Sequence, residues 1–78
     1  MKIRKTTVEG NQANVYIYEN KKEEYTVVAV PSIHWSILIP YVEGREEIMK
    51  KIKETISIKD VEVLDDLAEK IYFWVREM

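Results

Sequence analysis

The chain contains no cysteine and a single histidine among its 78 residues. Without cysteine it forms no disulfide and offers no thiolate to a metal, and one histidine would leave a zinc site dependent on several carboxylates. We therefore expect no metal centre and no other cofactor. A small domain without cysteine also fits a reducing compartment, so we expect a cytoplasmic protein.

Long apolar runs and a dominant charge are missing as well. No apolar stretch approaches the roughly 20 residues that a membrane-spanning helix needs, and none follows the basic start of the chain. We therefore expect neither a membrane segment nor a signal peptide. The formal net charge is −2, from 12 basic and 14 acidic residues, so no overall field attracts nucleic acid or an anionic membrane.

Motifs that mark catalysis are absent too. Gly10 and Gly44 are isolated, which excludes a glycine-rich phosphate loop. Ser32, His34 and Ser36 follow one another at two-residue spacing, but no acid partner, nucleophile elbow or oxyanion loop accompanies them. We interpret His34 as a half-exposed strand histidine. The sequence predicts a protein that is not an enzyme and has no catalytic residues.

The residues that are present describe one small domain, 1–78. Hydrophobic residues make up 46% of the chain and charged residues 33%, as in ordinary soluble domains. The first half of the chain repeats with period two and the second half with a helical period, and the change falls between Pro40 and Gly44. This order predicts an α+β domain in which a sheet precedes helices.

The first half predicts an antiparallel meander of three to four strands. Strands are expected at Lys2–Glu9, Asn14–Glu19, Glu24–Val30 and Ser32–Tyr41, with a turn at Gly10–Asn14 and a loop at Asn20–Glu23. Pro31 should end the third strand, because proline cannot donate to a ladder. The odd-numbered residues from Ile33 to Tyr41 are bulky and apolar, so we expect the fourth strand to bury that face. Whether 32–41 is one continuous strand is left open.

The second half predicts two amphipathic helices. The first is expected at Arg45–Ile56 with Gly44 at its cap, and the second runs from an N-cap at Asp60 to about Arg76. Their apolar stripes are Ile48, Met49, Ile52 and Ile56 in the first helix, and Leu64, Leu67, Ala68, Ile71, Trp74 and Val75 in the second. The predicted arrangement is ββββαα, with both helices packed on one face of the sheet.

Aromatic residues suggest a function for the other face of the sheet. Tyr16 and Tyr18 alternate with Val15 and Ile17, so they face outward if the aliphatic side is the core. The same outer face should carry His34, Ser36, Leu38 and, depending on the register, Tyr25 or Thr26. An exposed apolar face of this kind usually has a partner.

Phe73 is a second candidate contact. Five bulky apolar residues follow one another from Ile71 to Val75, and one helix stripe does not accommodate them all. Ile71, Trp74 and Val75 fit the core, which turns Phe73 sideways or outward. Either the helix buries a broad arc, or Phe73 belongs to an intermolecular contact.

Two functional hypotheses follow. The first is a non-catalytic interaction or regulatory protein, a homodimer or a binder of another protein, acting through Tyr16, Tyr18, His34, Ser36 and Phe73. The alternative is a small nucleic-acid-binding module. In it the same sheet face would stack bases, and Lys2, Arg4 and Lys5 of the first strand would contact phosphates. The net acidity of the chain counts against the alternative.

Overall fold

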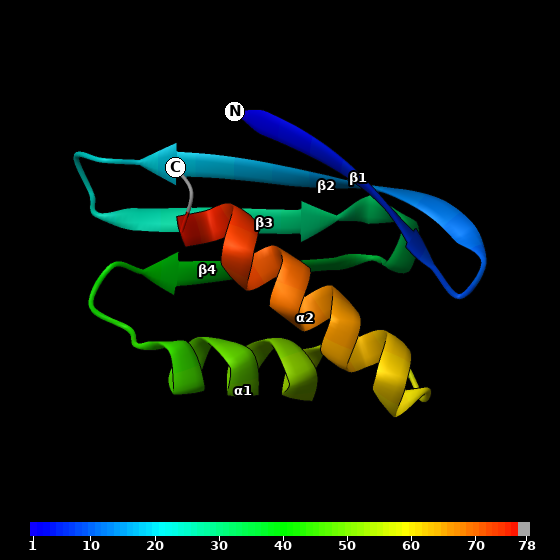
Figure 1. Ribbon diagram of the computed structural model, residues 1–78. Coiled ribbons are helices and arrows are strands. Elements are labelled where there is room, and N and C mark those ends of the chain that lie inside the picture. Colours follow the sequence, from blue (N-terminus) through cyan, green and yellow to red (C-terminus); the bar gives the residue numbers. More distant parts are fainter. Residues whose placement is uncertain (77–78) are drawn as a thin grey trace.

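The structure is a computed structural model that describes residues 1–76, and it shows a four-stranded antiparallel sheet followed by two helices (Figure 1). The elements are β1 (Lys2–Val8), β2 (Asn11–Asn20), β3 (Tyr25–Val30), a 3₁₀ helix (Pro31–Ile33), β4 (Trp35–Pro40), α1 (Arg45–Thr55) and α2 (Val61–Arg76). The strands lie in the order β1-β2-β3-β4. The predicted ββββαα arrangement is confirmed.

The first hairpin is tighter than predicted. Only Glu9 and Gly10 separate β1 from β2, and their φ angles are +50° and +83°. Positive φ at both central residues is the signature of a type I′ turn, whose twist matches that of the paired strands. The predicted turn at Gly10–Asn14 is therefore wrong, because Asn11 already pairs with Val8 and belongs to β2.

Pro31 ends β3 as predicted, but the next strand begins later than expected. Residues Pro31–Ile33 form one 3₁₀ turn, and His34 closes it at φ +52°, with its N–H donating to the carbonyl of Pro31 at 3.0 Å. Proline fixes φ at a helical value, which suits the first position of such a turn. The predicted strand Ser32–Tyr41 is therefore wrong at its start, and β4 covers Trp35–Pro40.

Alternation along the strands is confirmed where it was strong. Val15 and Ile17 are fully buried, whereas Tyr18 is 46% exposed on the opposite face. In β4, Trp35 and Ile39 are buried, so the odd-numbered side faces the core as predicted. The inward face of the sheet is therefore the aliphatic one.

Both helices begin where the sequence predicts. The α1 helix follows Gly44 and carries Glu46 and Glu47 in its first turn, where the helix dipole favours anions. Asp60 caps α2, because its Oδ1 accepts hydrogen bonds from the backbone N–H groups of Glu62 at 3.0 Å and Val63 at 3.4 Å. The apolar stripes of both helices are buried or half-buried in one core with the sheet.

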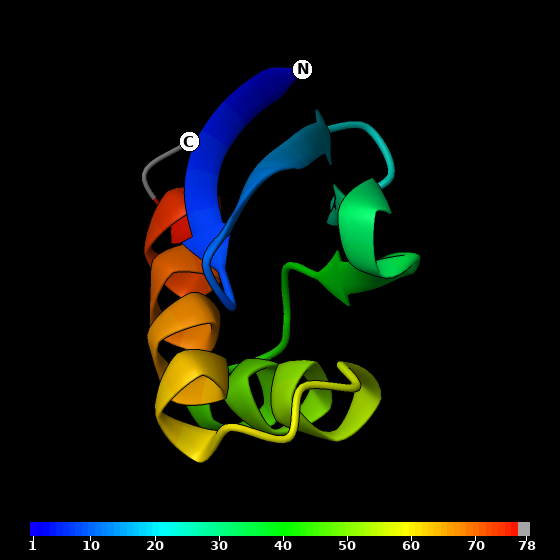
Figure 2. The same ribbon diagram turned by 90° about the vertical axis from the view of Figure 1, so that its right-hand side faces the viewer.

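The sheet curves around the helices (Figure 2), which lie together on one side of it. Two side-chain hydrogen bonds join the helices to the edge strands. Trp35 of β4 donates from Nε1 to Thr55 Oγ1 at 2.7 Å, and Lys70 of α2 donates from Nζ to Thr6 Oγ1 of β1 at 3.3 Å. Neither α1 nor α2 covers the opposite face of the sheet (Figure 1).

Candidate functional site

The sheet face opposite the helices, called the outer face from here on, presents two cross-strand rows. In register, Ile3, Tyr16, Ala29 and Ser36 form one row, and Tyr18, Val27 and Leu38 form the next. Antiparallel neighbours on one face lie about 4.5–5.5 Å apart at Cβ, so each row is a continuous strip of side chains. Tyr25 and Pro40 extend the outer face at one end.

Large apolar side chains on this face are exposed. Ile3 is 54% exposed, Leu38 48% and Tyr18 46%, and Tyr16 and Val27 between them are half-buried. These residues come from all four strands, so the apolar surface is contiguous rather than scattered. Contiguous apolar surface on a sheet is typical of an interaction site.

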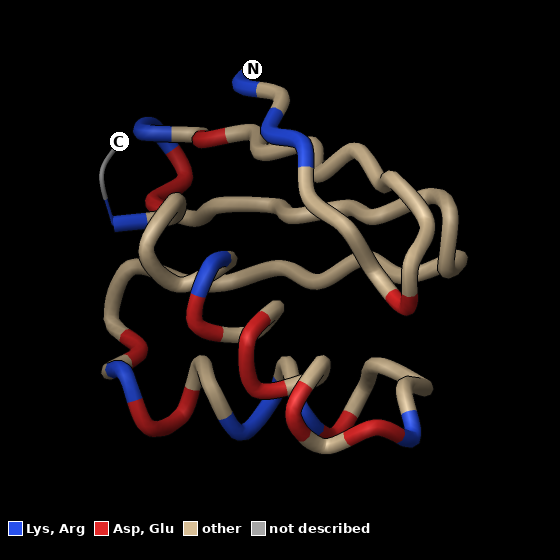
Figure 3. Tube along the Cα trace, turned by 45° about the vertical axis from the view of Figure 1, so that its right-hand side comes forward, with Lys and Arg blue, Asp and Glu red and all other residues tan. Residues whose placement is uncertain are grey.

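Charge is almost absent from the outer face. No Lys, Arg, Asp or Glu occurs between Tyr25 and Val42, and Figure 3 shows β3 and β4 uncharged while both helices carry many charges of both signs. Among the strand residues of the outer face, Lys5 alone is charged. Depletion of charged residues at the centre of a patch is the compositional mark of an interface core.

The outer face brings together most of the residues expected there. Tyr16, Tyr18 and Ser36 share it, and the register adds Tyr25, whose hydroxyl accepts a hydrogen bond from Asn20 Nδ2 at 3.2 Å. Thr26 lies on the core side and is 3% exposed.

His34 was predicted beside Ser36 on the strand, and this is wrong. It closes the 3₁₀ turn that precedes β4, and it is exposed there in a left-handed conformation. Pro31 forces that turn, so the two-residue spacing from Ser32 to Ser36 no longer places the three side chains on one strand face.

Phe73 is 64% exposed, as one reading of the sequence expects. It lies on α2, however, in the helix layer on the other side of the sheet (Figure 2). Phe73 therefore belongs to a different surface from Tyr16 and Tyr18.

The basic residues of β1 are divided between its two faces. Lys2 and Arg4 are paired with Ile17 and Val15 and share their face, whereas only Lys5 stands on the face of the tyrosines. The arrangement required for base stacking beside a row of phosphate contacts is therefore not assembled on the outer face.

Sequence reasoning missed Ile3 as a member of the outer face. Alternation in β1 is weak, because Lys, Arg and Thr occupy both of its sides. The signal that would have placed Ile3 is the Glu9–Gly10 turn, since a two-residue hairpin fixes the register and pairs Ile3 with Tyr16.

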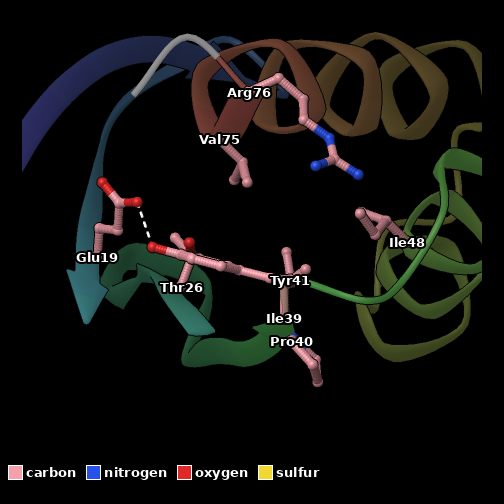
Figure 4. A pocket seen from close by; sticks show the side chains of 8 residues that line it. All are labelled: Glu19, Thr26, Ile39, Pro40, Tyr41, Ile48, Val75 and Arg76. Carbon is pink, nitrogen blue, oxygen red and sulfur yellow. Dashed lines mark hydrogen bonds between the residues drawn. The ribbon is translucent and has the colours of Figure 1, made fainter. Parts of the chain in front are cut away.

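A pocket of about 360 Å³ opens where the sheet and the two helices diverge (Figure 4). Its apolar wall comes from Ile39 of β4, Ile48 of α1 and Val75 of α2, and its other lining residues are Glu19, Thr26, Pro40, Tyr41 and Arg76. Glu19, Thr26 and Ile39 are neighbours in register across β2, β3 and β4, so they form one row on the core side of the sheet.

Tyr41 and Glu19 form a hydrogen bond at one end of this pocket (Figure 4). The Tyr41 hydroxyl donates to Oε2 of Glu19, and this bond to a carboxylate raises the pKa of Tyr41 from 10.0 to about 12. The hydroxyl of Tyr41 therefore stays protonated at neutral pH.

Arg76 lies at the other side of the pocket (Figure 4). Its Nη2 donates to the backbone carbonyl of Glu43 at 3.0 Å, and its guanidinium carbon is 5.5 Å from the centroid of the Tyr72 ring. The buried carboxylate of Glu43 accepts a hydrogen bond from Lys51 instead. Among residues 1–76, Arg76 makes no ion pair, so its charge is not neutralised by a carboxylate.

Two kinds of feature are absent from the described residues. Within residues 1–76, no three His, Asp or Glu side chains gather so as to hold a metal ion. Neither described helix is long and apolar enough to cross a membrane.

Comparison with known proteins identifies a family but no activity. A family model described as "YueH-like protein" matches residues 2–77. A protein of Bacillus subtilis (strain 168), described as "Uncharacterized protein YueH", is 38% identical over 82 aligned positions, which cover the whole of both chains. Neither description names a catalytic activity. No solved structure matches the chain.

Proposed function

We propose that this chain, which belongs to the family of YueH-like proteins, is a non-catalytic interaction protein that forms a homodimer through its outer face. The observation that carries the proposal is the exposure of Ile3, Tyr18 and Leu38 on a sheet face that carries almost no charge. Burying these side chains against a partner removes apolar surface from water, at roughly 25 cal/mol per Å².

A second copy of the chain is the occupant that fits this chemistry best. Most homodimers have two-fold symmetry, which brings identical patches together and places equal charges close to one another near the axis. An uncharged centre avoids that repulsion. The tyrosines at this centre supply large apolar area, and interfaces are enriched in tyrosine.

The size of the outer face indicates a dimer of modest affinity. At strand spacings of about 4.8 Å and 3.3 Å per residue, four strands of about six residues cover roughly 15 by 20 Å. That is roughly 300 Å² in projection, whereas a standard interface buries about 800 Å² on each partner, so this face is smaller than a standard interface. We expect a dissociation constant in the micromolar range.

The direct test places a charge at the centre of the outer face. Leu38→Lys puts two ammonium groups into the two-fold interface, and we expect it to convert a concentration-dependent dimer into a monomer. Sedimentation equilibrium over a micromolar series measures this. Val42→Lys is the matched control, because Val42 is 90% exposed in the loop after β4 and lies off the outer face.

Two further variants identify the surface that is used. Tyr16→Ala combined with Tyr18→Ala should weaken the dimer, whereas Phe73→Lys should leave it intact because Phe73 lies in the helix layer. If Phe73→Lys dissociates the dimer and Leu38→Lys does not, the interface is on the helices. A wild-type chain that stays monomeric up to the highest soluble concentration would refute self-association.

Nucleic-acid binding is the alternative function, and the position of Lys2 and Arg4 on the core face counts against it. Only Lys5 stands beside the tyrosines, so few phosphates could be neutralised there. A labelled single-stranded oligonucleotide titrated at two salt concentrations tests it. Binding that weakens as salt rises and is lost in Lys5→Gln would support it, and no binding at low salt would end it.

A further inference from the structure

The pocket between Glu19 and Arg76 is separate from the outer face and belongs to the core side of the sheet. The ends of β2, β3 and β4 form one wall, and Ile48 and Val75 from the two helices face them (Figure 4). Its volume of about 360 Å³ lies at the lower end of the range of small-molecule pockets. A ligand of that size has few non-hydrogen atoms, so the polar groups at each end decide which class of molecule fits.

Arg76 supplies one polar end. Its guanidinium has five N–H donors. Within residues 1–76 it forms one hydrogen bond, to the carbonyl of Glu43. A neutral carbonyl does not compensate a positive charge. The Glu43 carboxylate pairs with Lys51 through Oε1, and among residues 1–76 its buried Oε2 has no hydrogen-bond partner, Arg76 included. A guanidinium fork with spare donors beside an apolar wall matches a carboxylate, which accepts two parallel hydrogen bonds from it.

The wall beside Arg76 is apolar. Ile39, Ile48 and Val75 all line the pocket (Figure 4). Val75 is half-buried, whereas Ile39 and Ile48 are 2% and 1% exposed and present only a narrow surface to it. This wall fits a short aliphatic chain. The polar lining residues other than Arg76 and Glu19 are Thr26, which is 3% exposed, and Tyr41, whose hydroxyl donates to Glu19. The arrangement favours an amphipathic ligand over a fully polar one.

Glu19 supplies the opposite end and excludes a second anion. Its Oε2 is occupied by the Tyr41 hydroxyl, but its negative charge remains. A ligand with a carboxylate at each end would place one of them near Glu19, where like charges repel. The pocket should therefore accept a monocarboxylate and reject the corresponding dicarboxylate.

We propose that this pocket binds a small amphipathic monocarboxylate, with its carboxylate on Arg76 and its aliphatic chain along Ile39, Ile48 and Val75.

The test uses hexanoate as the probe and the intact chain as the protein. Titration followed by ¹H–¹⁵N chemical shifts should give saturable changes at Thr26, Tyr41 and Arg76, with a dissociation constant on the order of 1 mM for so small a ligand. Hexan-1-ol, which has the chain without the charge, should bind at least tenfold more weakly. Adipate, which adds a second carboxylate, should also bind at least tenfold more weakly.

Three variants assign the roles of the two ends. Arg76→Gln should weaken hexanoate binding about tenfold or more, because the charge-assisted hydrogen bonds are lost. Glu19→Gln should restore adipate to within a few fold of hexanoate. Arg45→Gln is the matched control, since Arg45 also packs on Tyr72, at 4.9 Å, but does not line this pocket, and it should leave binding unchanged.

Several results would overturn the proposal. They are the absence of saturable shifts in the pocket, equal affinity for hexanoate and hexan-1-ol, and undiminished binding by a folded Arg76→Gln variant. Shifts confined to Ile3, Tyr18 and Leu38 would show that hexanoate binds the outer face instead. Because Arg76 and Glu19 are absent from the outer face, these variants leave the dimer test independent of this one.

Discussion

Individual polar side chains fix the places where the layers of this protein meet. Trp35 donates to Thr55 and Lys70 donates to Thr6, so each edge strand is tied to a different helix. Arg45 and Glu69 join α1 to α2 through an ion pair of 2.6 Å whose partners are each about half exposed. Exposed pairs of this kind contribute about 0–1 kcal/mol, so packing of the core rather than the ion pair holds the helices together.

Tyr41 is expected to ionise at an unusually high pH. Its folded-state pKa is about 12 against an ordinary 10.0, because the neutral hydroxyl donates to Glu19. The hydrogen bond therefore contributes to folding at every pH below about 10 and is lost as the pH rises towards 12. A tyrosinate absorbance titration should show one tyrosine ionising near pH 12, and Tyr41→Phe should remove it.

The hydrogen bond to the Glu19 carboxylate is the largest cause of this pKa shift. Two variants distinguish its effect on the pKa of Tyr41 from the effect of the net charge of the chain. Glu19→Gln should return the late-ionising group towards the ordinary range. Glu23→Gln changes the charge equally, but Glu23 is not among the groups that raise the pKa of Tyr41, so it should leave the titration unaltered. A late step that survives in Glu19→Gln would contradict the assignment.

Among the elements, the β1–β2 hairpin does most to determine which residues lie on the outer face. Its two turn residues require positive φ, and Glu9 is a poor choice for this because its Cβ crowds the backbone there. We expect Glu9→Asn to raise the free energy of unfolding by about 0.5 kcal/mol, since Asn-Gly is a preferred type I′ pair. Urea unfolding measures the change.

Gly10→Ala is the opposite substitution in the same turn. A Cβ at Gly10 would meet no atom within 4 Å, so backbone strain at φ +83° is the sole penalty. We expect a loss of about 1 kcal/mol. Equal stability of Glu9→Asn, Gly10→Ala and the wild type would show that this turn does not limit the hairpin.

The elements also show how far local patterns reach. Asp60, Gly44 and the apolar stripes of α1 and α2 were predicted from residues within one or two helical turns, and the structure confirms them. The start of β4 was not predicted correctly, because the period-two pattern already begins at Ser32, inside the 3₁₀ turn Pro31–Ile33 that precedes the strand. Pro31 determines the conformation there. The spacing of apolar residues carries no information about the backbone N–H that proline lacks.

At the scale of the whole molecule, the two helices pack on one face of the sheet and leave the other face without a helix layer. Both helices pack on the inner side of a curved sheet, and the outer face remains apolar and almost uncharged (Figures 2 and 3). One core with the inner side of the sheet uses the apolar stripes of both helices. A second copy can cover the other face without additional secondary structure.

Self-association through this face has a thermodynamic signature. A dimer that dissociates on unfolding is stabilised by mass action, so its melting temperature rises with protein concentration. We expect such a rise for the wild type and for Val42→Lys in circular dichroism melts at a series of concentrations. Leu38→Lys should melt at a constant temperature. A constant melting temperature for the wild type would argue against the dimer.

The amino-acid sequence by itself determined the order of the elements and the buried face of each strongly patterned one. Side-chain period is a local property, so Val15, Ile17 and Ile39 could be assigned to the core without knowing their partners. Tyr16 and Tyr18 were placed on the outer face for the same reason.

Only the tertiary structure decided which surfaces these elements build together. The register of the β1–β2 hairpin places Ile3 beside the tyrosines, although β1 itself alternates weakly. The same register places Lys2 and Arg4 on the core face. The pocket brings Glu19, Tyr41 and Arg76 together from the ends of distant elements. No local period relates such residues, because their proximity depends on how the sheet curves and on where the two helices end against it.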